Sequence, residues 1–259
     1  MTLACLNGEL LPVAEAKIPV TDDGLLRGDG VFEVLRLYAG RPFALAEHLA
    51  RFERSAANLR LAVDVGCLRA DVERLLDAVD APDGLLRVLA TRGGARIVLI
   101  EPLPAYPEAL RLGYVTFAPT RVLDGVKSLS YAANMLCTRL ARERGFDEAL
   151  LVTPHGRVLE GPTSSFFWSR GGQLLTPPLE DHILASITRG LVLELTGAQE
   201  AVCTSEDIDA ADEAFLASTT REVTPVVAVE SRSLPAPGRL TSEAARLVRE
   251  RIEAELLRA

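Results

Sequence analysis

The spacing of apolar residues switches repeatedly between the period of a strand and the period of a helix, so this chain must form both. Residues 31–38 alternate apolar and polar side chains before a turn at Ala39-Gly40, as in a half-buried strand. Residues 46–59 then repeat apolar side chains at helical spacing, which predicts an amphipathic helix (Leu49, Phe52, Ala56 and Leu59). A mixed α and β fold is therefore expected.

The pattern of expected elements changes near residue 119. Before that point we expect several strands and two helices, whereas helices and strands alternate beyond it, with long helices over 131–145, 186–197 and 241–257. The composition also changes over 119–125, as it does in a connector. We therefore expect a small N-terminal α+β domain over 1–118, an interdomain linker over 119–125, and a larger C-terminal α/β domain over 126–259.

Composition excludes several classes of function. A net charge of −8 and an isoelectric point near 5.1 argue against nucleic acid or an anionic membrane as a general partner. No run of apolar residues approaches the length of a membrane span, and the N-terminus lacks the order of a signal peptide. Cysteines and histidines are scattered, so we expect no metal site, no disulfide framework and a cytoplasmic protein (Cys5, Cys67, Cys137, Cys203, His48, His155 and His182).

Lysine is nearly absent from this chain. Lys17 and Lys127 are the only lysines among the 28 Lys and Arg residues. Arginine stays protonated in proteins, whereas lysine can become the neutral amine that attacks a carbonyl carbon. Lys17 lies in a polar N-terminal stretch and is expected at the surface. Lys127 begins the segment Lys127-Ser128-Leu129-Ser130-Tyr131 before a helix, and is either a lysine that forms a Schiff base or a chance surface residue.

A Schiff-base lysine that holds a pyridoxal cofactor needs supporting groups, and the sequence offers a candidate for each. Glu160 ends an apolar strand and could pair with the ring nitrogen, although such a residue is also an ordinary solvated strand end. The helix start at Ser186-Ile187-Thr188 and the cluster Ser218-Thr219-Thr220 could bind a phosphate, or could be simple caps and turns. Arg51 is expected on the polar face of helix 46–59 with His48 and Arg54.

Six segments in order resemble one enzyme family. They are Gly28-Asp29-Gly30-Val31-Phe32-Glu33, Glu47-His48-Leu49-Ala50-Arg51-Phe52, Lys127-Ser128-Leu129, Leu159-Glu160-Gly161, the segment 183–189 (Ile-Leu-Ala-Ser-Ile-Thr-Arg) and the segment 218–226 (Ser-Thr-Thr-Arg-Glu-Val-Thr-Pro-Val). Together they resemble the class IV, or fold type IV, pyridoxal-phosphate enzymes over nearly the whole chain. That family contains D-amino-acid and branched-chain aminotransferases, (R)-amine transaminases and aminodeoxychorismate lyase.

The resemblance implies roles for individual residues. Lys127 would form the aldimine with pyridoxal 5'-phosphate and move a proton between the substrate Cα and the cofactor, and Glu160 would pair with the ring nitrogen. Tyr131 would reach the phenolic oxygen of the cofactor, and Leu184 would pack under its ring. The phosphate would be held by a further set of side chains and amides (Arg51, Ile187, Thr188 and Thr219). The resemblance also implies a homodimer that acts on an amino acid and a 2-oxo acid.

The position of this chain within the family is less sharply marked. Residues 220–226 resemble the aminotransferase version, and residues 30–34 resemble the D-amino-acid branch, so a D-amino acid is the favoured donor. The D-amino-acid enzymes follow Thr-Arg-Gly with an Arg and a nearby His, whereas residues 91–98 here contain no His. In those enzymes the Arg and the His clamp the carboxylate of the substrate. The loss of that clamp would suit (R)-primary amines. An aminodeoxychorismate lyase and an L-branched-chain aminotransferase stay as alternatives, and substrate-binding candidates are Phe32, Arg27, Arg92, Arg96 and Thr220.

Overall fold

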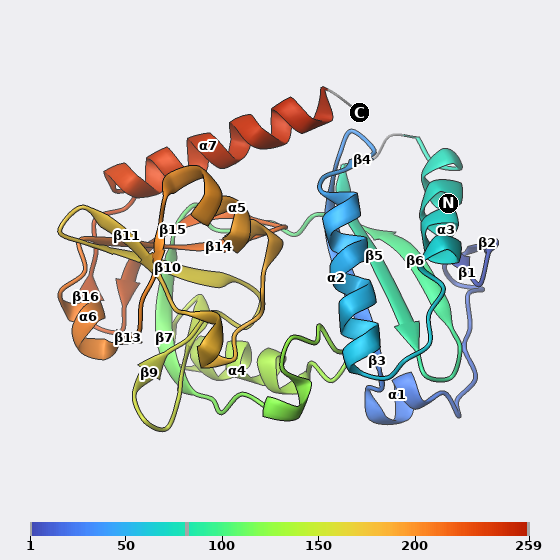
Figure 1. Cartoon of the computed structure of the whole chain (residues 1–259), viewed down its shortest axis with the longest axis horizontal. Coiled ribbons are helices and arrows are strands. Elements are labelled where there is room, and N and C mark those ends of the chain that lie inside the picture. Colours follow the sequence, from blue (N-terminus) through green and yellow to red (C-terminus); the bar gives the residue numbers. More distant parts are fainter. Residues whose placement is uncertain (1, 81–82, 258–259) are drawn as a thin grey trace. The chain divides into compact units, whose positions relative to one another are not determined.

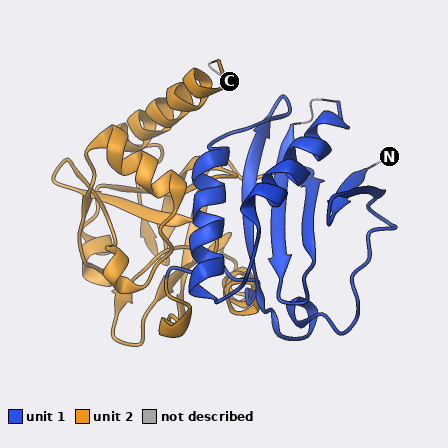
Figure 2. Ribbon diagram, turned by 45° about the vertical axis from the view of Figure 1, so that its right-hand side comes forward, with its two compact units in different colours: residues 1–104, 125–131 blue, residues 105–124, 132–259 orange. Residues whose placement is uncertain are grey.

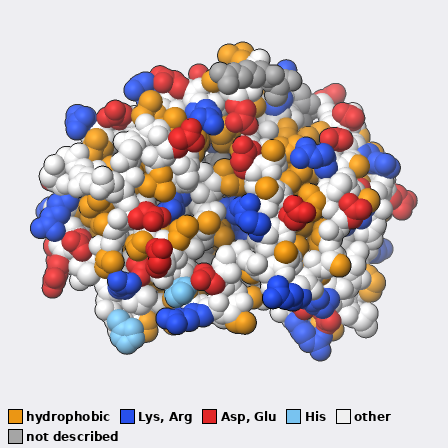
Figure 3. All heavy atoms as spheres, viewed as in Figure 1, with side chains coloured by type: hydrophobic (Ala, Val, Ile, Leu, Met, Phe, Trp, Pro, Cys, Tyr) orange, Lys and Arg blue, Asp and Glu red, His pale blue; other side chains and the backbone are white. Residues whose placement is uncertain are grey.

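The computed structural model describes residues 2–80 and 83–257 (Figure 1). The chain divides into two compact units, each built from two stretches of sequence (Figure 2). Unit 1 comprises Met1–Pro104 and Gly125–Tyr131, and unit 2 comprises Ala105–Asp124 and Ala132–Ala259. Within the described part of the chain, no helix is long and apolar enough to cross a membrane. Basic and acidic side chains are interspersed over the face drawn in Figure 3.

Unit 1 is an antiparallel sheet with two long helices on one face. Its described strands run in the spatial order β2-β1-β6-β5-β3-β4. The strands are β1 (Leu3–Leu6), β2 (Glu9–Pro12), β3 (Gly30–Tyr38), β4 (Arg41–Pro42), β5 (Gly84–Thr91) and β6 (Arg96–Glu101). The helices are α1 (Asp23–Arg27), α2 (Leu45–Asn58) and α3 (Val65–Asp77). The strand expected over 31–38 and the helix expected over 46–59 are thus confirmed to within one residue.

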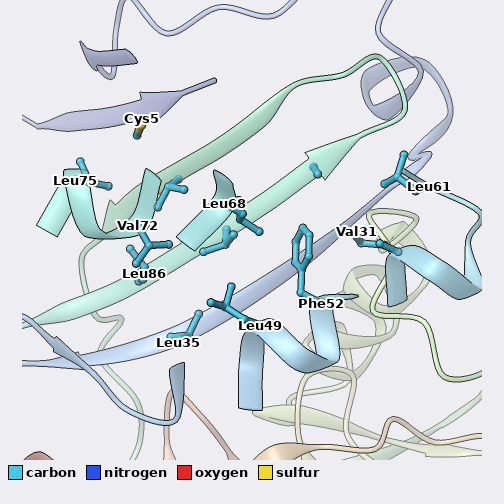
Figure 4. Packing of buried hydrophobic residues seen from close by; sticks show 14 of the residues in the cluster. Cys5, Val31, Leu35, Leu49, Phe52, Leu61, Leu68, Val72, Leu75 and Leu86 are labelled. Carbon is cyan, nitrogen blue, oxygen red and sulfur yellow. The ribbon is translucent and has the colours of Figure 1, made fainter. Parts of the chain in front are cut away.

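The core of unit 1 lies between the sheet and helices α2 and α3. Phe52, Leu68 and Leu86 are fully buried and belong to the cluster drawn in Figure 4. Alternate residues of β3, such as Leu35, reach this core because successive strand side chains point to opposite faces. On α2, the apolar residues Leu49, Phe52 and Ala56 lie in the same core, so the periodicity of residues 46–59 predicts the face of the helix that the sheet covers.

Unit 2 is a larger mixed sheet with helices. Its described strands follow the order β12-β11-β10-β14-β15-β7-β8-β9-β13, and β16 pairs with β15. The strands are β7 (Leu110–Thr116), β8 (Glu148–Val152), β9 (Arg157–Val158), β10 (Ser165–Arg170), β11 (Gln173–Thr176), β12 (Gln199–Glu200), β13 (Cys203–Thr204), β14 (Glu213–Ser218), β15 (Glu222–Val229) and β16 (Arg232–Ser233). The helices are α4 (Ala132–Glu143), α5 (Ile187–Thr196), α6 (Ser205–Asp209) and α7 (Arg239–Leu256), with short 3₁₀ turns at Arg121–Leu123 and Leu179–Asp181.

The two units differ from the expected division of the chain in two segments. Strand β7 was expected in the N-terminal domain (1–118), but it pairs in parallel with β8 and β15 and so belongs to unit 2. Residues 125–131 were expected at the end of the linker and the start of the second domain (126–259), but they belong to unit 1. The reason is backbone pairing with β3, because Phe32 N–H donates to the Lys127 carbonyl at 3.1 Å and Leu129 N–H donates to the Gly30 carbonyl at 2.9 Å.

Candidate active site

Lys127 lies on a segment that pairs with the first residues of β3. A bridge joins Ser128 to Val31, and the Lys127 N–H donates to the hydroxyl of the fully buried Ser55 on α2 at 3.1 Å. The backbone on both sides of Lys127 is therefore fixed by β3 and by α2. The side chain is half-buried, unlike the exposed side chain of Lys17.

The amine of Lys127 lies against two aromatic rings of unit 1. Its Nζ is 4.4 Å from the centroid of the Phe32 ring and 5.6 Å from that of the Tyr131 ring. The two rings meet edge to face, with centroids 5.2 Å apart. Cations are attracted to ring faces at such distances, so the rings hold the amine in one region of space. Unit 1 thus brings together three of the residues predicted from the sequence.

A buried ionic network joins β3 to α2. Arg51 donates from Nε to Oε1 of Glu33 at 2.6 Å and from Nη2 to Oε2 at 2.7 Å, and Nδ1 of His48 lies 2.7 Å from Oε2. Glu33, His48 and Arg51 have exposed fractions of 0 %, 1 % and 5 %. The polar face expected for this helix is therefore buried at His48 and Arg51, because Glu33 on the neighbouring strand pairs with both side chains. Arg54, on the same helix, is exposed.

The pKa values of the network follow from burial and pairing. Burial raises the pKa of the Glu33 carboxyl, but hydrogen bonds from Arg51 and His48 outweigh it and hold the pKa at about 2. Burial also lowers the pKa of His48, against the opposing effect of Glu33. His48 is therefore neutral at pH 7, and Nδ1 carries the proton because an ionised carboxylate only accepts. Its buried Nε2 has no hydrogen-bond partner among the described residues.

The three arginines predicted to bind a substrate carboxylate are each engaged within unit 1. Arg92 donates to Asp29 at 2.5 Å, to the Arg60 carbonyl at 3.1 Å and to the Leu59 carbonyl at 2.9 Å. Arg96 pairs with the buried Asp71, and the exposed Arg27 pairs with Asp23 on its own short helix. Arg92 thus connects the residues after α2 (Leu59 and Arg60) to Asp29, just before β3, and these contacts stabilise the fold of unit 1.

In unit 2, Glu160 and Leu184 lie side by side. Glu160 lies two residues after the end of β9, and its Oε1 accepts the Leu184 N–H at 3.1 Å. The backbone carbonyl of Glu160 accepts the Leu151 N–H at 2.9 Å, and Gly161 pairs with Ser164 to close the turn that follows. The carboxylate is half-buried and its backbone is held by the sheet. The predicted ring-nitrogen partner and the residue predicted to pack under the ring are thus brought together.

The N-terminus of α5 is arranged as the sequence predicts. Ser186 is the N-cap, and its hydroxyl accepts the Arg189 N–H at 3.3 Å. The amides of Ile187 and Thr188 are in the first turn, where a helix supplies no acceptor, and the described residues provide none. Thr188 has an exposed fraction of 5 %. Such free amides at the positive end of a helix bind phosphate groups.

Thr219 and Thr220 lie at the tip of the hairpin that joins β14 and β15. Ser218 pairs with Glu222, so the loop contains three residues, and Glu222 has a positive φ of 58°. The hydroxyl of Ser218 accepts the Arg221 N–H at 3.3 Å, and the Tyr106 hydroxyl lies 3.1 Å from that of Thr220. The predicted hydroxyl and amide cluster is therefore a short, hydrogen-bonded loop.

Sequence reasoning missed several charged or aromatic neighbours of these residues. In unit 1, Glu33 belongs to a segment that resembles the family, but its residue type alone indicates no role. In unit 2, Glu148, Tyr106 and Arg221 lie around the hairpin loop, and Arg221 likewise belongs to such a segment. No local signal links these side chains, because their partners are far apart in the sequence.

Comparison with known proteins identifies the family. The family described as amino-transferase class IV matches residues 30–229. A putative branched-chain-amino-acid aminotransferase of Methanocaldococcus jannaschii is 33% identical over 257 residues, which cover 88% of each chain. A D-alanine aminotransferase of Bacillus licheniformis is 33% identical over 260 residues, which cover 91% of this chain and 92% of that one. The branched-chain aminotransferase structure of Thermoproteus uzoniensis with norvaline superposes with a TM-score of 0.90 at 30% identity, over 97% of this chain and 95% of that one.

This chain therefore belongs to the class IV aminotransferases. It has the fold of the type IV transaminases, and it is an aminotransferase that uses pyridoxal 5'-phosphate. The groups present fit that cofactor: an amine for its aldehyde on Lys127, a carboxylate for its ring nitrogen on Glu160, and unpaired amides for its phosphate at Ile187 and Thr188.

Proposed function

We propose that this aminotransferase moves an amino group between a D-amino acid and a 2-oxo acid, with Lys127 as its catalytic residue. The observation that carries the proposal is the arrangement of Phe32 and Lys127. The segment around Phe32 is the one that resembles the D-amino-acid branch, and the Phe32 ring lies 4.4 Å from the amine of Lys127. D-alanine aminotransferases among the similar proteins support the same donor.

The chain's own groups then have separable tasks. The bound cofactor supplies an electron-accepting ring that lowers the energy of negative charge at the substrate Cα. Lys127 would take the proton from that carbon at Nζ and deliver it to the cofactor carbon that bears the imine, while Phe32 and Tyr131 restrict where the amine can move. Glu160 accepts a hydrogen bond from the protonated ring nitrogen and keeps the proton there. The Tyr131 hydroxyl would bind the phenolic oxygen of the cofactor, and Leu184 would pack under the ring.

The phosphate end is assigned to four residues. The free amides of Ile187 and Thr188 and the hydroxyl of Thr219 supply neutral donors. Arg51 supplies a charge-assisted donor, but Glu33 offsets its charge, so its contribution is directional rather than a net positive field. A set of mostly neutral donors fixes the orientation of a phosphate through hydrogen-bond geometry.

The carboxylate of the substrate is assigned to the backbone amides near Thr220. Arg92 and Arg96 already pair with Asp29 and Asp71, which supports the view that neither forms a carboxylate clamp. Weak dependence on a carboxylate extends the proposal to (R)-primary amines as slower donors. An L-branched-chain donor is the second candidate, favoured by the similarity to the Methanocaldococcus jannaschii protein.

We also propose a homodimer. Val34, Leu89, Ile97 and Leu99 are half-buried apolar side chains on the face of the unit 1 sheet that points away from α2 and α3. A second copy is the partner that the family resemblance implies for such a face. Light scattering should give about twice the chain mass of 27.9 kDa, whereas a monomer at micromolar concentration would contradict the proposal.

Half-reactions test the donor directly. The purified holoenzyme is mixed with D-alanine, L-leucine or (R)-1-phenylethylamine, and the loss of its visible absorption is followed. We expect the fastest loss with D-alanine and a slower loss with (R)-1-phenylethylamine. Loss with L-leucine alone would replace the D-amino-acid proposal by the second candidate. Release of pyruvate from aminodeoxychorismate without an amino acceptor would instead indicate a lyase.

A further inference from the structure

The side chain of Arg221 connects the hairpin loop to two other parts of unit 2. Its Nη2 lies 2.5 Å from Oε2 of Glu148, at the start of β8, and donates to the hydroxyl of Thr163 at 3.1 Å. Its guanidinium stacks over the Tyr106 ring, 5.0 Å from the centroid. The side chains of Arg221 and Glu148 are both only 7% exposed, so the pair is shielded from water.

These contacts join two segments that have separate tasks in the proposed function. Thr163 lies in the turn that follows Glu160, the proposed partner of the ring nitrogen. Arg221 follows Thr219 and Thr220, the proposed phosphate and carboxylate residues. One planar guanidinium therefore spans from the loop at the phosphate end of the cofactor to the turn at its ring-nitrogen end.

We infer that Arg221 is a positioning residue that sets the spacing between the Thr219-Thr220 loop and the Glu160 turn. It does not touch the cofactor in this proposal: its Nη2 faces both Glu148 and Thr163, and its buried Nε has no hydrogen-bond partner among the described residues. Glu148 anchors the guanidinium to the central strands, and Tyr106 holds the guanidinium plane from one side. This inference rests on the proposed roles of Glu160 and Thr219.

Two contacts within the loop are long, and one of its residues has an unfavourable backbone conformation. Within the hairpin, the Ser218 hydroxyl accepts one backbone N–H at 3.3 Å and lies 3.4 Å from the Thr220 hydroxyl. Glu222 adopts a left-handed conformation that is unfavourable for a residue with a side chain. A buried ion pair at Arg221 holds the loop in this arrangement before a ligand arrives, which removes an ordering cost from binding.

The test uses the full chain with R221K. Lysine keeps a positive charge for Glu148, but a single ammonium lacks the planar fork that also reaches Thr163 and stacks on Tyr106. A second variant, T163V, removes only the acceptor on an exposed residue and leaves the buried pair intact. The matched control is R144K. Arg144 pairs with Glu230, just beyond the opposite end of β15, about 30 Å from Arg221 along the strand.

Two measurements decide the inference. In the cofactor-free protein, amide hydrogen exchange at residues 219–221 should accelerate in R221K and T163V and stay unchanged in R144K. In titrations, R221K should weaken pyridoxal 5'-phosphate about tenfold, whereas pyridoxal, which lacks the phosphate, should change less than about twofold. A lowered melting temperature with unchanged exchange and unchanged cofactor affinity would overturn the positioning role. Wild-type protein whose cofactor affinity is the same with and without the phosphate would instead refute the proposed phosphate site.

Discussion

Replacing Glu33 by Gln should destabilise the protein by about 3 kcal/mol at pH 7. The Glu33 carboxylate is fully buried and accepts two hydrogen bonds from Arg51 and one from His48. Its pKa falls from the ordinary 4.5 to about 2, and that difference corresponds to about 3 kcal/mol of folding free energy. The same loss viewed from Arg51, which becomes a buried cation without its counter-charge, is of similar size, about 3 to 5 kcal/mol, and is not an additional cost.

The pH dependence has a definite sign. Because the folded pKa lies below the unfolded one, the stabilisation is fully present above pH 4.5 and is lost as the pH falls towards about 2. The difference in unfolding free energy between wild type and E33Q should therefore be constant from pH 5 to pH 7 and shrink in acid. His48 contributes a separate slope: because burial lowers its folded pKa below the unfolded 6.5, the unfolding free energy should fall as the pH drops below about 6.5, and this slope belongs to His48 and not to Glu33.

Denaturant unfolding, followed by circular dichroism on the cofactor-free protein, measures the difference. The matched control is E101Q, since Glu101 pairs with Arg87 on the same sheet but both side chains are about one-third exposed. That control should change the unfolding free energy by less than about 1 kcal/mol. If E33Q and E101Q give equal, small losses, the buried network does not stabilise unit 1 and the reasoning from burial and pairing is refuted.

Three further outcomes are expected. K127A should lose transaminase activity and should no longer be labelled by the cofactor on borohydride reduction, whereas K17A, at the exposed lysine, should keep both properties. Peptide mapping of the reduced protein shows which lysine carries the cofactor. R92A should lower the melting temperature, because the tie to Asp29 is lost, yet leave the KM for the amino acid within about twofold, and a large rise in KM would restore Arg92 as the carboxylate clamp. F52A should destabilise unit 1 by about 3 to 5 kcal/mol in urea unfolding, because it empties a fully buried site; a loss below 1 kcal/mol would mean that the core repacks.

Elements governed by local periodicity could be predicted from the sequence. The strand expected over 31–38 is β3, the helix expected over 46–59 is α2, and the closing helix expected over 241–257 is α7, displaced by two residues at its start. In each case the pattern of apolar residues coincides with the buried face. Lys127 could be identified as a candidate because its chemistry differs from that of the arginines which dominate the basic residues.

Features that depend on distant partners could not be predicted. His48 and Arg51 are polar residues on an amphipathic helix, and only the proximity of Glu33, on a strand that precedes the helix, explains their burial. Arg92 is equally suited by residue type to a substrate carboxylate and to Asp29, and the structure supplies the second. Periodicity gives the face of an element but not the residue that will oppose it.

The discontinuous make-up of unit 1 has a consequence for synthesis on the ribosome. The segment 125–131, which carries Lys127 and pairs with β3, emerges only after β7 has left the ribosome. Strand β7 cannot pair in the sheet until β8 and, much later, β15 have been synthesised. Since domains tend to fold as they emerge, both units pass through a period with an incomplete sheet. No single cut in the chain can separate them, and a fragment ending at Pro104 lacks Lys127 altogether.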